Sequence, residues 1–94
     1  MILSYRDKRT GAFAEGGFVR DFQGFATQAY KRLEILEAAT GLEDLRALPS
    51  NRLETLRASR TGQYSIRINQ QWRVCFKWLQ GASGPSAVEI VDYH

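Results

Sequence analysis

The spacing of hydrophobic positions changes near Pro49, from the repeat of helices to the repeat of strands. Before it, apolar side chains recur three and four positions apart, which predicts a helix over residues 22–39 with one buried stripe made of Phe22, Phe25, Ala26, Ala29, Leu33 and Leu36. Gly41 stands where a helix commonly ends. Three leucines at 42, 45 and 48 predict a second, short helix that stops before Pro49.

After Pro49 apolar and polar residues alternate, which is the pattern of half-buried strands. Residues 52–57 begin the change and 58–62 form a turn. The alternating apolar side chains then fall into two groups: Tyr64, Ile66 and Ile68, and Trp72, Val74, Phe76 and Trp78. Residues 81–86 read as a hairpin loop and 88–94 as the last strand. At the other end of the chain, residues 2–5 predict a short strand and residues 11–15 one helical turn.

These elements predict one α+β domain over residues 1–94, with N-terminal helices packed on one face of a mainly antiparallel sheet. Ile66, Ile68 and the 72/74/76 positions should face the helices, and the two tryptophans should help to fill the core. The opposite face would then carry Arg67, Arg73, Lys77 and Arg57. Arginines on strands are held more rigidly than arginines on loops, as a phosphate-stabilising site requires.

Composition narrows the class of protein. No segment approaches the ~18 apolar residues that a membrane span needs, and no apolar run near Met1 is long enough for a signal peptide. Cys75 is the only cysteine, so no disulfide framework is expected and a cytoplasmic location is the simplest. One cysteine and one histidine do not make a conventional structural zinc site, and no metal or cofactor is predicted.

The net charge of +3 conceals an uneven distribution. From residue 46 to 77 there are seven basic residues and one acid, Glu54, so this stretch carries +6 and the rest of the chain −3. Six of the seven are arginine, which binds phosphate oxygens in a forked geometry. The pattern favours a polyanionic partner, most simply nucleic acid. The competing interpretation is a solubilising sheet face whose arginine stems cover apolar surface.

The chain's only histidine, His94, follows Asp92 and Tyr93 at the end of the last predicted strand. An unperturbed imidazole titrates near neutral pH and can exchange a proton there. A terminal histidine in a small protein is most often solvated and inert, so the position indicates a site only together with the basic stretch before it.

Four segments together resemble the HigB toxins, the plasmid-maintenance killer proteins of the RelE-like superfamily. They are Asn51-Arg52-Leu53-Glu54-Thr55-Leu56, Gly62-Gln63-Tyr64-Ser65-Ile66-Arg67-Ile68-Asn69, Gln71-Trp72-Arg73-Val74-Cys75-Phe76-Lys77-Trp78 and Val88-Glu89-Ile90-Val91-Asp92-Tyr93-His94. The resemblance is strongest over residues 49–94. It implies a small RelE-like, microbial-ribonuclease-like α+β fold and a toxin that cuts mRNA in the ribosomal A site without a metal. It also implies a HigA-type helix-turn-helix antitoxin, through which the complex binds operator DNA.

The resemblance also assigns site residues. Asp92, Tyr93 and His94 match the C-terminal catalytic cluster, Arg73 the arginine of a Trp-Arg motif, and Arg57 a basic position. Glu54 departs from members that carry histidine there, in a Leu-His-Pro-Leu context. Four further basic side chains of the stretch are expected to contact mRNA or rRNA: Arg52, Arg60, Arg67 and Lys77.

Metal-free RNA cleavage needs a base for the 2′-hydroxyl, cations for the phosphate oxygens and an acid for the departing 5′-oxygen. His94 suits the acid. Glu54 or Tyr93 is the candidate base, with Glu54 preferred on ordinary pKa. Arg57 and Arg73 would stabilise charge on phosphorus, and Asp92 would orient His94 or Arg73.

Each role has a structural competitor. Glu54 could instead pair with Arg57 or Arg73, Asp92 could be a strand-end salt-bridge partner, and Tyr93 could pack beside the sheet. For the whole chain, the alternatives are a non-catalytic RNA- or ribosome-binding module, and a decayed toxin that acts only as partner of an antitoxin covering its basic surface.

Overall fold

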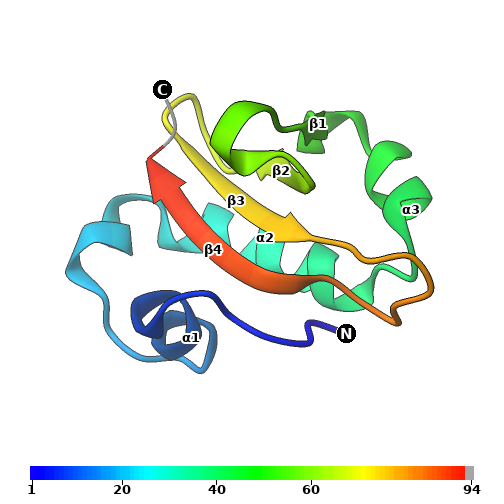
Figure 1. The fold of residues 1–94 in the computed structure, drawn as a ribbon. Helices are drawn as coiled ribbons and strands as arrows, with labels where there is room; N and C mark the ends of the chain where they lie inside the picture. Colours follow the sequence, from blue (N-terminus) through cyan, green and yellow to red (C-terminus); the bar gives the residue numbers. More distant parts are fainter. Residues whose placement is uncertain (93–94) are drawn as a thin grey trace.

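A four-stranded antiparallel sheet forms the centre of the computed structural model, which describes residues 1–92, so the predictions for Tyr93 and His94 lie outside the described residues. The strands are β1 (Glu54–Thr55), β2 (Gln63–Arg67), β3 (Trp72–Lys77) and β4 (Ser86–Asp92), and they lie side by side in chain order (Figure 1). The predicted α+β architecture with an antiparallel meander is therefore confirmed.

The helices α1 (Lys8–Ala14), α2 (Ala26–Ala38) and α3 (Leu42–Arg46) precede the sheet, with α2 crossing behind β3 and β4 in Figure 1. The helix predicted from residue 22 begins at Ala26, because residues Arg20–Phe25 form the 3₁₀ helix η1 and Phe25 has a non-helical φ of −137°. Two further 3₁₀ turns, η2 (Pro49–Asn51) and η3 (Ala58–Arg60), flank β1.

Two N-terminal predictions needed correction. Residues 2–5 are not a strand: Tyr5 makes a single parallel bridge to Val88, and Ser4 Oγ accepts the Ala87 N–H at 2.9 Å, so the segment runs beside β4 without joining the ladder. The single turn predicted at residues 11–15 is a seven-residue helix. It starts earlier because Asp7 Oδ1 accepts the Thr10 N–H at 2.9 Å and caps α1.

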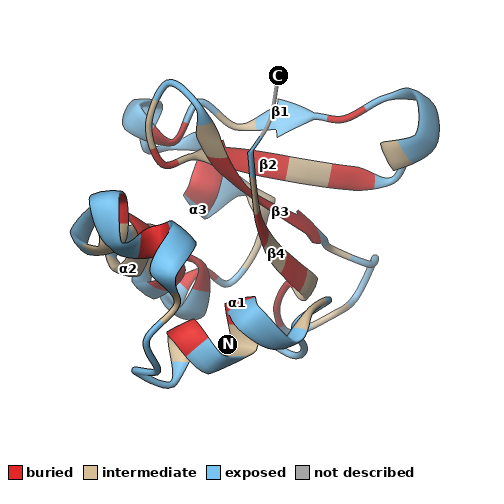
Figure 2. Cartoon of the chain, turned by 90° about the vertical axis from the view of Figure 1, so that its left-hand side faces the viewer, coloured by how far each residue is buried: buried red, intermediate tan, exposed pale blue. Residues whose placement is uncertain are grey.

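The hydrophobic core lies between the helices and one face of the sheet. Ala29, Leu33 and Leu36 of α2 are buried against strand residues that alternate along β2, β3 and β4, namely Ile66, Val74, Phe76, Val88 and Ile90. Trp72 lies at the end of this core, where its ring centroid is 4.8 Å from that of Phe25, and Trp78 also packs against the core. The predicted core face and the core role of both tryptophans are confirmed. Figure 2 colours the buried parts of the helices and strands red.

The other face of the sheet carries the polar side chains. Strand register aligns Glu54, Ser65, Cys75 and Glu89 in one row across all four strands, and Arg67, Arg73 and Val91 in the next row. We call this surface the arginine face. Its centre is not open to solvent, because Ser65 and Cys75 are fully buried and Arg73 is only 8% exposed. Within the described residues, no helix is both long and apolar enough to span a membrane.

Candidate active site

Arg73 is the most tightly held residue of the arginine face. Its Nε donates to Ser65 Oγ at 2.7 Å, and its Nη2 donates to the backbone oxygen of Arg52 at 2.6 Å. The Arg52 backbone is left-handed, with φ of 45°, a conformation that non-glycine residues seldom adopt. Arg52 directly follows η2, and its carbonyl oxygen accepts the hydrogen bond from the Arg73 guanidinium. Sequence alone predicted Arg73 on this face but not its burial.

Glu54 lies beside Arg73, with 3.7 Å between Glu54 Oε1 and Arg73 Nη1. The Glu54 side chain is 52% exposed, so one partner of the pair reaches solvent while the other lies beneath the surface. The pairing that the sequence left open as a structural role for Glu54 is therefore present. The exposure leaves the carboxylate accessible to a ligand as well.

Glu89 on β4 lies at the opposite end of the row that begins with Glu54. One of its oxygens, Oε2, lies 3.5 Å from Arg6 Nε and 3.6 Å from Arg60 Nη1, and it has no hydrogen-bond donor among the described residues. Arg60 Nη1 also donates to Gln63 Oε1 at 3.2 Å. Arg60 was predicted from sequence as an RNA contact. Arg6 and Glu89 were missed, because Arg6 precedes the basic stretch and reaches the sheet only through the pairing of Tyr5 with β4.

Cys75 lies between these two groups of charges. Burial raises the pKa of its thiol to about 11, with a further upward contribution from Glu89, while Arg60, Arg73 and Arg6 act in the opposite direction. The same three arginines are thus close enough to one buried atom to act on it electrostatically. A buried thiol with a raised pKa is a poor nucleophile, in agreement with the prediction that Cys75 is a small buried residue.

Arg52 and Arg67 line a cleft of about 450 Å³ at the end of β2. The other lining residues are Arg32, Ser50, Ile68, Asn69 and Gln70. Arg32 comes from α2 and was not predicted. Its Nη1 donates to Asn51 Oδ1 at 2.7 Å, and burial lowers its pKa from the ordinary value. Three guanidinium groups and two amides around one cleft suit an anionic ligand with polar edges.

The remaining predicted residues are more dispersed. Arg57 and Lys77 are exposed, Arg57 just before η3 and Lys77 at the end of β3. Asp92 is exposed and accepts from Gln71 Nε2 at 2.9 Å. Register pairs Asp92 with Trp72 and Val91 with Arg73, so the Asp92 and Arg73 side chains leave opposite faces of the sheet. This geometry favours a strand-end role for Asp92 over direct orientation of Arg73.

No group of three or more potential ligands for a metal ion occurs within residues 1–92. The chemistry that the arginine face can support is that of fixed cations and carboxylates. The buried, strand-held guanidinium of Arg73 and the half-exposed carboxylate of Glu54 beside it can hold a phosphodiester and accept a proton.

Comparison with known proteins identifies the family. The family model described as the RelE-like toxin of the type II toxin–antitoxin system HigB matches residues 3–94. Toxin HigB-1 of Vibrio cholerae is 44% identical over 85 residues, covering 88% of this chain and 90% of that protein. An uncharacterised protein of Haemophilus influenzae is 38% identical over 48 residues, about half of each chain. The match is nearly full-length and agrees with the small α+β fold, so this chain belongs to the HigB-like family of RelE-like toxins of type II toxin–antitoxin systems.

Proposed function

We propose that the chain is a metal-independent, ribosome-dependent endoribonuclease that cuts mRNA in the ribosomal A site. The observation that carries the proposal is the clustering of charged groups at the arginine face. Arg6 and Arg60 lie 3.5 and 3.6 Å from Glu89 Oε2. Arg73 lies beside the half-exposed carboxylate of Glu54. Preorganised cations are the largest single source of stabilisation for charge that develops on a reacting phosphate.

The reaction is an internal transfer within the RNA strand. The 2′-oxygen attacks the adjacent phosphorus and loses its proton to a base, while the bond from phosphorus to the 5′-oxygen breaks and that oxygen gains a proton. The products are a 2′,3′-cyclic phosphate and a 5′-hydroxyl end. We assign the acid to His94 and the base to Glu54, with Tyr93 as the second candidate for the base.

Arg73 and Arg57 would stabilise the charge on the phosphate oxygens in different ways. Arg73 is held by Ser65 and the Arg52 carbonyl, so it offers a fixed position. Arg57 is exposed just before η3, where its side chain is accessible to RNA. Asp92 would position the C-terminal cluster. Arg52, Arg60, Arg67 and Lys77 would contact mRNA or rRNA along the same surface, with an affinity that falls steeply with salt.

The family implies an antitoxin partner, and we propose that it is a HigA-type helix-turn-helix protein. In that scheme the complex binds operator DNA through the antitoxin. The toxin acts in the cytoplasm, where translating ribosomes are.

The chemistry of the RNA ends tests the proposal. Ribosomes translating a defined mRNA are incubated with toxin that was treated with EDTA and then freed of chelator. The fragments should carry a 2′,3′-cyclic phosphate and a 5′-hydroxyl. Fragments with a 5′-phosphate would point to a metal-dependent hydrolysis and contradict the mechanism. The absence of cutting by a correctly folded chain that still binds ribosomes would favour the non-catalytic binding module.

A further inference from the structure

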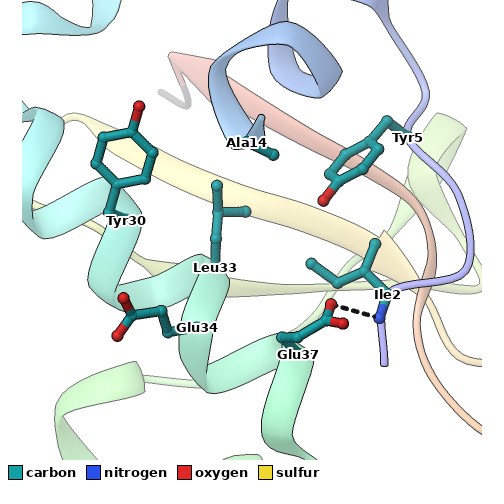
Figure 3. Close-up of a pocket in the computed structure, with 7 residues that line it drawn as sticks. All are labelled: Ile2, Tyr5, Ala14, Tyr30, Leu33, Glu34 and Glu37. Carbon is teal, nitrogen blue, oxygen red and sulfur yellow. Dashed lines mark hydrogen bonds between the residues drawn. The ribbon is translucent and has the colours of Figure 1, made fainter. Parts of the chain in front are cut away.

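A groove on the helical side of the molecule is chemically unlike the arginine face. It has a volume of about 360 Å³ and is lined by Ile2, Tyr5, Ala14, Tyr30, Leu33, Glu34 and Glu37, and we call it the acidic groove. Figure 3 shows Tyr30, Leu33, Glu34 and Glu37 projecting from α2, opposite Ile2 and Tyr5 of the N-terminal segment. The α2 residues are three or four positions apart and therefore share one face of the helix.

The floor and walls of the acidic groove are apolar and rigid. Leu33 is 5% exposed and belongs to the core, and the Tyr30 ring stacks on Phe13 with 4.2 Å between centroids. Ile2 is fixed because its N–H donates to Glu37 Oε2 at 2.8 Å, which ties the N-terminal segment to α2. Side chains that are already held in place lose little entropy when a partner binds, and this favours a preformed docking surface.

The charge of the acidic groove is negative in a chain of net charge +3. Glu34 and Glu37 line it, and no basic side chain does. Neither carboxylate forms an ion pair within the described part of the chain, whereas Glu43, Glu54 and Glu89 each do. Burial raises the pKa of Tyr5, and the negative charges of Glu37 and Glu15 raise it further. Glu15 is therefore a third carboxylate that acts on a residue of the groove.

A carboxylate-lined surface repels RNA, so the acidic groove does not extend the RNA-binding surface. It complements a protein segment with apolar side chains for the Leu33 and Tyr30 walls and lysine or arginine for Glu34 and Glu37. Charge complementarity of this kind selects the partner and fixes its register. The family supplies the partner protein, because these toxins belong to toxin–antitoxin systems.

We propose that the acidic groove docks a basic, apolar-anchored segment of the antitoxin. The proposal rests on the toxin–antitoxin assignment and not on the cleavage mechanism. Because the acidic groove lies on the helical side of the sheet, this contact holds the antitoxin without covering Arg73. It differs in this respect from the expectation that the antitoxin covers the basic surface.

Growth rescue tests the proposal with full-length toxin and the antitoxin encoded beside it. The test variant is the double reversal Glu34→Lys/Glu37→Lys, at two exposed positions of α2. Because Glu37→Lys also removes the acceptor of the Ile2 N–H, the single reversal Glu34→Lys is tested beside it and should weaken rescue in the same direction. The control for a charge reversal outside the groove is Glu43→Lys on α3, which is compared with the single reversal Glu34→Lys because both change the net charge by the same amount; the Glu43 side chain is 88% exposed. The double variant should still arrest growth but should no longer be rescued by antitoxin, whereas the control should be rescued like the wild type. A double variant that antitoxin neutralises as well as it neutralises the wild type would overturn the proposal.

Isothermal titration calorimetry of purified toxin with antitoxin gives the dissociation constant of their complex directly. Reversal of two contacting charges should weaken binding by about 10- to 100-fold. If the reversed chain fails to fold by circular dichroism, the charge-neutral pair Glu34→Gln/Glu37→Gln decides. Its affinity should fall by about 3- to 10-fold, as for the loss of two surface ion pairs, and an unchanged value would overturn the proposal.

Two other outcomes have separate meanings. A wild-type chain that forms dimers in sedimentation, with dimers lost in the reversed variant and antitoxin affinity unchanged, would assign the acidic groove to a second copy and overturn the proposal. A wild-type chain that does not arrest growth would count against the proposed nuclease. The titration would then still show whether the acidic groove binds the antitoxin.

Discussion

Replacing Arg73 by lysine should destabilise the fold before it affects any chemistry. Arg73 is 8% exposed and uses Nε and Nη2 for two short bonds, to Ser65 Oγ and the Arg52 carbonyl. Lysine keeps the charge but has one nitrogen, which can reach only one of these acceptors. The other acceptor is left buried without a donor.

The size of the effect follows from the lost bond. A hydrogen bond to a charged group contributes about 1.5–3 kcal/mol, and an unpaired buried acceptor costs about 1–3 kcal/mol. The Glu54 pair adds at most about 1 kcal/mol, because the carboxylate is half exposed. We expect Arg73→Lys to lower the free energy of unfolding by about 2–4 kcal/mol, a large part of the ~5–14 kcal/mol typical of a domain of this size.

Urea unfolding, followed by tryptophan fluorescence, measures this loss. With an m-value of about 1–1.5 kcal/mol/M, the midpoint should fall by about 2 M. The control is Arg67→Lys, at the position that pairs with Arg73 across the strands. Within residues 1–92 its side chain makes one hydrogen bond, from Nε to the Asn69 carbonyl. It should cost less than about 1 kcal/mol. Equal midpoints for the two variants would refute the structural role assigned to Arg73.

Further predictions concern Asn51 and Cys75. Asn51→Ala should lower the free energy of unfolding by about 2 kcal/mol in urea, because the fully buried amide bonds both Arg32 and the Leu45 carbonyl; a change below about 0.5 kcal/mol would contradict this. The raised pKa of Cys75 means that the folded state holds this proton more tightly, so stability should fall as pH rises from 9 to 11. Cys75→Ala should remove that part of the slope, and identical slopes would argue against it. Glu89→Gln should lower the pKa of Cys75, measured by thiolate absorbance, since the Glu89 charge raises it; an unchanged thiol titration would contradict this electrostatic link.

Periodic segments were predicted well because their burial follows a regular repeat. The alternation at Ile66, Val74 and Phe76 identified the core face of the sheet, and register then fixed which arginines share the other face. The α2 stripe was identified for the same reason. Its start was predicted four residues early, because Phe22 and Phe25 keep an apolar spacing inside a 3₁₀ turn that periodicity does not distinguish from an α-helix.

Long-range polar contacts could not be predicted from the sequence. Nothing local indicates that Arg6 reaches Glu89, 83 positions away in the chain, or that the backbone of Arg52 turns left-handed towards Arg73. Basic composition predicted Arg60 and Arg67 as contacts for a polyanion, but it does not distinguish a solvated guanidinium from the buried one of Arg73. The acidic groove also escaped prediction, since its walls come from α2 and from a segment expected to be a strand.

The most direct test of the central claim is primer-extension mapping of an mRNA translated in a reconstituted system, with the wild type compared with His94→Ala. We predict cuts inside codons that require the ribosome, persist with metal-depleted toxin and disappear in the variant. Cuts of equal strength from His94→Ala would contradict the assigned acid. The absence of cuts from folded wild-type toxin would contradict the nuclease itself.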